Sequence, residues 1–224
     1  MTFRNKLLVI GAGPIGLAMA KALNERGIAY DHVDAGPGIG GNWRHGLYAN
    51  VHIVSSKRTT AFADFPMPED YPDFPSAAQM LRYLESYARR FGLDERVECG
   101  RQVTAVRPLP NDTWRVVLDG REERHYKGVV VCNGHHRAPR WPSYPGQETA
   151  NIIHAHDYRE PAQLAGKRVL VIGGGNSACD IASEAARVGL SSDMSLRSGY
   201  WFLPKTFLGR PLTDLPIWSL PVFM

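Results

Sequence analysis

Apolar residues near the start of the chain follow first a strand pattern and then a helix pattern. The run LLVI at 7–10 is typical of a short buried strand, and PIGLAMAKALNERG at 14–27 repeats small and apolar residues at helical spacing. A second apolar stretch at 29–34 ends in Asp34, and the turn-rich AGPGIGG follows it. The pattern predicts a strand, a helix and a second strand joined by tight turns.

The middle of the chain predicts a loop, a helix and a meander. The segment 62–75 holds four prolines among aromatic and acidic residues, which favours a stiff, ordered loop. A helix is expected next, because Ser76 and Gln79 have capping-box spacing and Gly92 suits a helix end. Three β-rich runs then predict a small meander that returns to a parallel sheet: RQVTAVRP, TWRVVLDG and GVVVCNG.

The opening pattern repeats after a proline-rich linker at 137–146. Residues 167–189 again predict a strand, a glycine turn and a helix, and 193–197 predict a further strand. The fold class is therefore α/β with two Rossmann-like dinucleotide-binding units. The second unit shows only two clear strands, and the apolar tail at 215–224 is typical of an interface. We expect the fold to be truncated at its C-terminus and completed by further polypeptide, by a second chain or in a homo-oligomer.

The first glycine turn matches the dinucleotide fingerprint GxGxxG. Its glycines permit a tight turn, a close approach of pyrophosphate to the backbone, and close packing of helix on strand. The helix start offers unpaired N–H groups to the anion, and an acid at the end of the next strand suits the ribose hydroxyls. The alternative is a purely structural turn. We assign this site to Gly11, Gly13, Pro14, Ile15, Gly16 and Asp34.

The second glycine turn, at Gly173 and Gly175, carries a different residue after its second strand. In the first unit Asp34 stands 23 residues after Gly11, whereas Arg197 stands 24 residues after Gly173 and is followed by Ser198. An acid there would repel a 2′-phosphate, whereas arginine would pair with it in a charge-assisted contact. We therefore expect this site to prefer NADPH over NADH. The alternative is that Arg197 is a solvated arginine at a strand end.

Composition excludes several other functions. The formal net charge of +4 comes from scattered residues, so a nucleic-acid partner has little support. The three cysteines, Cys99, Cys132 and Cys179, are too far apart for a CxxC redox pair or a zinc site. His154 and His156 form an HxH pair with no acid or cysteine cluster nearby, so no metal is expected. We expect no membrane segment and a cytoplasmic location.

Six segments, in order, carry a family resemblance: VIGAGPIGL, GIGGNW, DFPMPEDYPDFPS, VVVCNGHH, VIGGGNSACDIASE and YWFLPKTFLGRPLTD. Together they closely resemble the N-terminal half of the flavin-containing monooxygenases, or class B flavoprotein monooxygenases. The resemblance implies an FAD-binding domain at 1–150 and the start of an NADPH-binding domain at 151–224. It adds three residues of a GGxW-type flavin turn and one strand residue to the FAD site: Gly41, Asn42, Trp43 and Val103. To the NADPH site it adds Asn176, Ser177 and Asp180.

Two segments depart from the family pattern. The linker fingerprint retains His154 and Tyr158 but has Glu148 and Ala150 in place of Phe and Gly. The tyrosine at position 158 argues against a place among the related Baeyer–Villiger enzymes. Beside the flavin, the family has an asparagine three residues before a lysine, and here that position is Val54, which cannot donate a hydrogen bond. We assign the catalytic segment to Ser55, Ser56 and Lys57. Lys57 is equally well read as a surface lysine on a loop.

The resemblance implies an NADPH-dependent flavin monooxygenase. NADPH would reduce FAD, and O2 would form a flavin hydroperoxide that oxygenates a soft nitrogen or sulfur nucleophile of a small molecule. Two alternatives stay open: an NADPH oxidase that releases peroxide, favoured by Val54, and a non-catalytic dinucleotide-binding fragment, favoured by the short chain.

Overall fold

A computed structural model describes residues 3–215 and divides the chain into two compact units. The first unit comprises residues 1–45 and 78–138, and the second comprises residues 46–77 and 139–224. Residues 46–77 therefore belong to the second unit, although they interrupt the first in sequence. The division into cofactor domains at residue 150 stays a prediction. The apolar tail from residue 216 onward, which the sequence analysis interprets as an interface, lies outside the described residues.

The first unit is built on a six-stranded sheet with the order β3-β2-β1-β6-β5-β4. The strands are β1 (Phe3–Ile10), β2 (Tyr30–Asp34), β3 (Val97–Cys99), β4 (Val103–Pro108), β5 (Trp114–Leu118) and β6 (Glu122–Val131). Strand β1 pairs in parallel with β2 and β6, β2 pairs in parallel with β3, and β4, β5 and β6 form an antiparallel meander. This confirms the predicted meander that returns to a parallel sheet. The sequence analysis missed β3.

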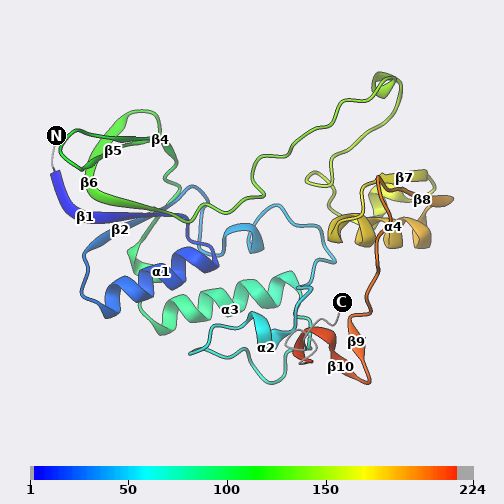
Figure 1. The fold of residues 1–224 in the computed structure, drawn as a ribbon, viewed down its shortest axis with the longest axis horizontal. Helices are drawn as coiled ribbons and strands as arrows, with labels where there is room; N and C mark the ends of the chain where they lie inside the picture. Colours follow the sequence, from blue (N-terminus) through cyan, green and yellow to red (C-terminus); the bar gives the residue numbers. More distant parts are fainter. Residues whose placement is uncertain (1–2, 216–224) are drawn as a thin grey trace, which may run out of the picture. The chain divides into compact units, whose positions relative to one another are not determined.

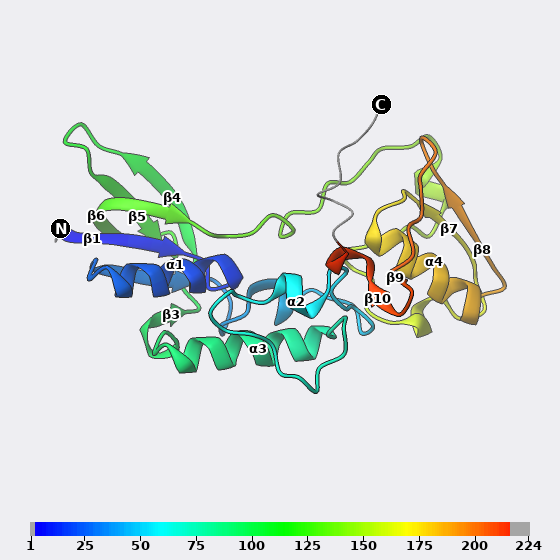
Figure 2. The ribbon, with the colours of Figure 1, turned by 60° about the horizontal axis from the view of Figure 1, so that its bottom comes forward.

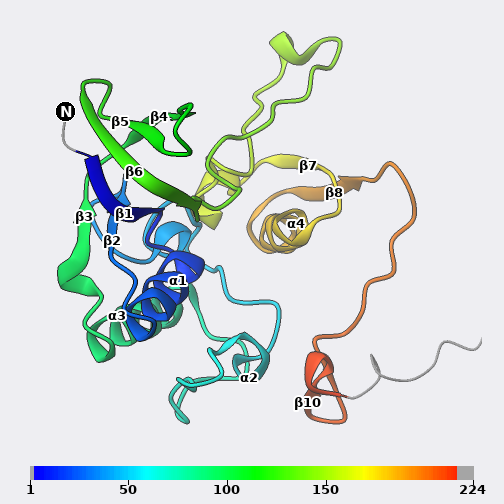
Figure 3. The same ribbon diagram turned by 60° about the vertical axis from the view of Figure 1, so that its left-hand side comes forward.

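Helices α1 (Pro14–Glu25) and α3 (Ala77–Arg90) lie side by side on one side of this sheet (Figures 1 and 3). Each buries one apolar face, with Leu17 and Ala20 on α1 and Leu84 and Tyr87 on α3 inaccessible or nearly so. Between the parallel strands and the meander, a second core is formed by Leu8, Val33, Val116, Leu118 and Tyr126. Short 3-10 turns occupy Gly41–Trp43 and Asp94–Arg96.

The second unit contains a parallel pair of strands with one long helix. Strands β7 (Arg168–Ile172) and β8 (Ser191–Ser195) flank α4 (Asn176–Val188), which lies beside both strands (Figure 2). The predicted strand, glycine turn, helix and strand are thus confirmed, with β8 beginning two residues earlier than expected. Smaller elements complete the unit: α2 (Lys57–Thr60), β9 (Thr206–Phe207), β10 (Arg210–Pro211) and 3-10 turns at Gln147–Thr149, Pro161–Leu164 and Leu212–Asp214. Among the described residues, none of the helices has the length and apolarity needed to cross a membrane.

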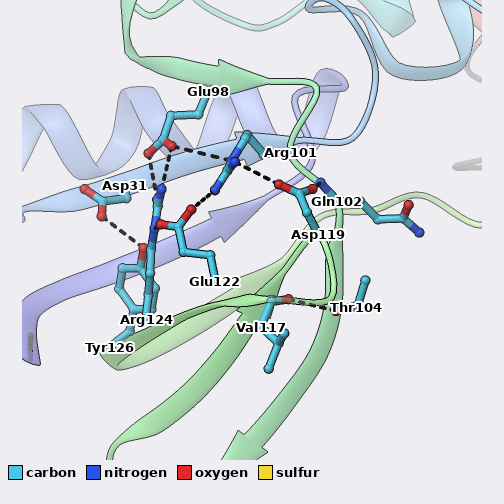
Figure 4. Close-up of polar contacts among 10 residues, drawn as sticks. All are labelled: Asp31, Glu98, Arg101, Gln102, Thr104, Val117, Asp119, Glu122, Arg124 and Tyr126. Carbon is cyan, nitrogen blue, oxygen red and sulfur yellow. Dashed lines mark hydrogen bonds and ion pairs between the residues drawn. The ribbon is translucent and has the colours of Figure 1, made fainter. Parts of the chain in front are cut away.

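A network of charged side chains links the meander to the parallel strands (Figure 4). Arg124 of β6 donates from both terminal nitrogens to the carboxylate of Glu98 on β3, at 2.8 Å each, and from Nε to Glu122 at 2.6 Å. Arg101, just before β4, pairs with Asp119 at 2.8 Å and also with Glu122. Arg124 is nearly buried, so its charge depends on these carboxylates for compensation. Donation from Arg124 lowers the pKa of Glu98 below its ordinary value.

We predict that replacing Arg124 with Gln lowers the stability of the chain near neutral pH and reduces the amount of stability that the chain loses on acidification. Because the pKa of Glu98 is lower in the folded chain, its contribution to stability is present above the ordinary carboxyl pKa of about 4.3 and is lost as pH falls through the folded value. The variant should lose about 1–3 kcal/mol of unfolding free energy near neutral pH, the range for hydrogen bonds to a charged group. Urea unfolding followed by circular dichroism at pH 7 and at decreasing pH measures this.

The matched control is Arg115→Gln, because Arg115 lies on β5 and pairs with Glu123 at 3.3 Å in a more exposed position. Wild type and R115Q should lose stability on acidification, whereas R124Q should start less stable and lose less. Equal stability of R124Q and wild type at pH 7 would contradict the role assigned to the network.

Candidate functional site

The first glycine turn connects β1 to α1 and leaves no space for side chains at two positions. Gly11 has φ +103°, which favours glycine, and an added Cβ would overlap the carbonyl oxygen of Cys132, which directly follows β6. At Gly16, an added Cβ would overlap the carbonyl oxygen of Gly11. These contacts match the roles of the first and third fingerprint glycines in tight turning and close helix packing.

Gly13 differs, because a Cβ added there would make no close contact. It is the N-cap of α1, no side chain caps the helix there, and Pro14 begins the helix. An added Cβ would meet only the Cα of Gly41, at 3.8 Å. The first N–H groups of α1 have no side-chain cap, and Ile15 in the first turn is 66% exposed.

The segment containing the GGxW-type turn lies beside the first glycine turn. Gly40 N–H donates to the carbonyl oxygen of Ala12 at 3.0 Å, and the 3-10 turn Gly41–Trp43 follows. The structure thus brings Gly41 next to Gly13, with Asn42 and Trp43 in the same turn. Val103 is the first residue of β4 and packs against the core cluster that includes Leu8 and Val33.

Asp34 lies at the end of β2, as expected, and holds the backbone of two loops. Its Oδ2 accepts from Ala12 N–H and its Oδ1 accepts from Gly36 N–H, each at 2.6 Å. Contact with a ribose stays a prediction, and each carboxylate oxygen retains a further lone pair for it. His32, two residues earlier, also contacts the glycine turn. The sequence analysis missed this residue, although strand alternation places positions 32 and 34 on the same side of β2.

The second glycine turn repeats this geometry in the second unit. Gly173 has φ +117° and donates to the carbonyl oxygen of Ser195 at 3.0 Å, and Gly175 is the N-cap of α4. No side chain caps α4, and a Cβ added at Gly173 or Gly175 would have nothing within 4 Å. Asn176 and Ser177 form the first turn of the helix. This helix start also suits an anionic phosphate group.

Three other residues assigned to the second site lie at α4 and at the end of β8. Asp180 on α4 accepts a hydrogen bond from the Tyr48 hydroxyl at 2.8 Å. Arg197 and Ser198 are exposed and follow the last residue of β8, Ser195. The N–H of Gly11 donates to Val33 and that of Gly173 donates to Ser195, so Arg197 lies one residue beyond the position that is equivalent to Asp34.

The catalytic segment predicted at Ser55, Ser56 and Lys57 is held by its own neighbours. Ser56 is buried and caps α2: its oxygen accepts from Thr59 N–H at 3.1 Å, and its hydroxyl donates to Asp214. The Ser55 hydroxyl lies 2.6 Å from that of Thr60. Lys57 donates to the carbonyl oxygens of residues in the proline-rich loop, including Glu69 at 2.8 Å. These contacts favour the reading of Lys57 as a loop lysine, and the catalytic role of the segment stays a prediction.

A buried carboxylate anchors the segment 46–77 to α4. Glu184 is 5% exposed, accepts from the Asn50 amide at 2.6 Å, and also accepts from the Tyr158 hydroxyl. Tyr48 packs against Tyr158 with ring centroids 5.6 Å apart. Burial and the neighbouring carboxylates raise the pKa of Tyr48 to about 12, and burial also raises the pKa of Tyr158. Both hydroxyls therefore stay protonated at neutral pH, and they donate to Asp180 and to Glu184, respectively. The sequence analysis missed Glu184, because an acid on a helix is usually exposed.

The histidines of the HxH pair interact with their own segment. His154 Nδ1 accepts from the backbone N–H of His156 at 3.0 Å, and its ring lies 5.3 Å from that of Trp141. Within residues 3–215, the structure has no group of three side chains arranged to hold a metal ion.

Comparisons with known proteins agree with this geometry. The family model described as flavin-binding monooxygenase-like matches residues 4–215. Dimethylaniline monooxygenase [N-oxide-forming] 2 of Cavia porcellus is 36% identical over 220 residues, which cover 89% of this chain and 41% of that protein. The chain thus spans less than half the length of this relative.

Solved structures give the same result. The S-allyl-L-cysteine S-oxygenase of Allium sativum aligns with a TM-score of 0.80 at 28% identity, over 92% of this chain and 54% of that one. The OTEMO complex with FAD and NADP aligns with a TM-score of 0.70 at 25% identity, over 88% of this chain and 39% of that one. The family model covers nearly all of the described residues, and the chain therefore belongs to the flavin-binding monooxygenase-like family.

Proposed function

We propose that the chain binds FAD at the first glycine turn and NADPH at the second, as the dinucleotide-binding part of a flavin monooxygenase. The observation that carries the proposal is the pair of uncapped helix starts, at Gly13 and Gly175, each following a parallel strand. Each start offers N–H groups that no side chain caps, which suits a pyrophosphate. The OTEMO structure, a complex with FAD and NADP, supports this pair of cofactors.

FAD fits the first site better than the second. There the glycine turn lies beside the turn Gly41–Trp43, and Asp34 at the end of β2 fixes Ala12 N–H, while its remaining lone pairs can serve a ribose. When bound, FAD supplies the activation of O2, and the protein supplies binding and orientation. Oxygen transfer from a flavin hydroperoxide is the finer mechanism that we propose from the resemblance.

A soft nitrogen or sulfur nucleophile is the proposed class of substrate. Two relatives support it: one is named for N-oxide formation, and the other is named as an S-oxygenase. The substrate itself, O2 use and the cytoplasmic location are proposals for the whole protein. Completion of the fold by a second chain or in a homo-oligomer is also a proposal, and the exposed Trp201, Phe202 and Leu208 support it.

An NADPH oxidase is the second candidate, because Val54 is 51% exposed and offers no hydrogen-bond donor where the family has asparagine. The hydroxyls of Ser55 and Ser56 are also engaged with Thr60, Thr59 and Asp214. Peroxide released per NADPH consumed, measured with and without an amine or sulfide, separates the two functions. A coupled monooxygenase yields oxygenated product and little peroxide, whereas an oxidase yields one peroxide per NADPH.

We predict that Gly13→Val abolishes FAD binding while the chain still folds. Gly13 has φ −76°, and a Cβ there meets only Gly41 Cα at 3.8 Å, so the fold accepts a side chain but the pyrophosphate loses its space. The measurement is the ratio of flavin to protein absorbance after desalting. The matched control is Gly175→Val in the second turn, which should keep its flavin. A G13V protein with full flavin content would contradict the assignment of FAD to this turn.

We predict that Arg197→Ala weakens NADPH binding by about ten- to a hundredfold, because a charge-assisted contact to the 2′-phosphate contributes about 1.5–3 kcal/mol. NADH lacks that phosphate, so its affinity should change by less than about threefold. Titration calorimetry with both nucleotides measures the two dissociation constants. Arg187→Ala, at the other end of α4, is the control and should affect neither nucleotide. Equal losses of affinity for NADPH and NADH in R197A would show that Arg197 does not bind the 2′-phosphate.

A further inference from the structure

Two side chains of β2 hold a single peptide group of the first glycine turn from opposite sides. The carbonyl oxygen of Gly11 lies 2.9 Å from Nε2 of His32, and the N–H of Ala12 donates to Asp34 Oδ2 at 2.6 Å. Both atoms belong to the Gly11–Ala12 peptide, which is planar. Its orientation is therefore fixed by His32 through the oxygen and by Asp34 through the nitrogen.

The Gly11–Ala12 peptide needs such restraint because of the residue that precedes it. Gly11 has φ +103°, and glycine populates many backbone conformations, so it does not by itself fix the plane of the next peptide. The peptide leads directly to Gly13 and the start of α1, where the anion-binding N–H groups lie. Rotation of this peptide would change the entry of the chain into that helix start.

We propose that His32 is a positioning residue for FAD, which holds the Gly11 carbonyl and thereby presets the glycine turn for the pyrophosphate. The inference rests on the proposed FAD site and deepens it. His32 acts through the peptide and does not need to touch the cofactor.

The chemistry of the contact fixes the tautomer of His32. A carbonyl oxygen can only accept, so Nε2 carries the proton and donates it to Gly11. Nδ1 is buried and has no hydrogen-bond partner among the described residues, which agrees with the neutral ring. His32 is 1% exposed, and burial lowers its pKa despite the opposing effects of the Gly11 carbonyl and Asp34. The Tyr30 ring on β2 has its centroid 6.3 Å from that of His32.

Packing against α1 also limits which side chains can occupy position 32. The ring nitrogen Nε2 would lie 3.3 Å from a Cβ added to Gly16, so the first turn of α1 rests close to the imidazole. A replacement for His32 must therefore fill a similar space and also present a donor at the Nε2 position. Glutamine meets both conditions, whereas methionine fills the space and cannot donate.

The test compares His32→Gln with His32→Met in the full chain. FAD dissociation constants are measured from the quenching of flavin fluorescence, and apoprotein stability is measured by urea unfolding. We expect H32Q to bind FAD within about threefold of wild type and H32M to bind at least about tenfold more weakly, which corresponds to about 1.4 kcal/mol. Val33→Ala, a truncation of a fully buried neighbour on β2, should lower apoprotein stability and leave FAD affinity within about threefold.

Three results would overturn the proposal: H32M binding FAD as tightly as wild type, H32Q as weak as H32M, or V33A losing as much FAD affinity as H32M. The last result would mean that stability alone controls binding. Wild type that fails to bind FAD would instead refute the proposed function.

A second readout needs no FAD, and its first part needs no variant. Nitrogen NMR of the histidine side chains in the wild-type apoprotein should show His32 neutral at pH 7, with its proton on Nε2 and slow exchange of that proton. In the variants, amide exchange at Ala12 and Gly13 should be faster in H32M than in H32Q. A proton on Nδ1, or fast exchange of the Nε2 proton, would overturn the inference even if no variant folds.

Discussion

The unpaired N–H groups at a helix start are the feature on which both candidate sites depend. An α-helix leaves its first N–H groups without internal partners, and they must find side chains, water or a ligand. In this chain, α1 and α4 begin at glycines and have no side-chain caps. Three features together position the first of these helix starts. They are the strand before it, the close contacts at Gly11 and Gly16, and the hydrogen bond from Ala12 to Asp34 of β2.

The two glycine turns differ in the residues that restrain them. The first turn is restrained by neighbours, since Gly11 lies against Cys132 and Asp34 binds Ala12. At Gly173 and Gly175 of the second turn an added Cβ would meet no neighbour, and the helix is instead restrained by hydrogen bonds to Asp180 and Glu184. These acids bind Tyr48 and Asn50, so the segment 46–77, with Ser55 and Lys57, is attached to the unit that we propose binds NADPH.

Local patterns in the sequence predict the parts of this fold that depend on local chemistry. Both glycine turns, their helices and the meander follow from spacing, because each residue type acts on its immediate neighbours. Strand β3 was missed because three residues are too short for a periodic signal, and it forms only by pairing with β2. The contacts of Arg124, His32 and Glu184 join residues distant in sequence. Likewise, no pattern shows that Ser56 caps a short helix and binds Asp214.

The central claim is that one chain holds FAD at the first turn and receives electrons from NADPH at the second. The most direct measurement is the visible absorbance spectrum of the purified chain, recorded before and after NADPH is added without oxygen. The account predicts a flavin spectrum at one FAD per chain that bleaches with NADPH and bleaches much more slowly with NADH. A chain that holds no flavin when supplied with FAD, or a bound flavin that NADPH does not reduce, would contradict it.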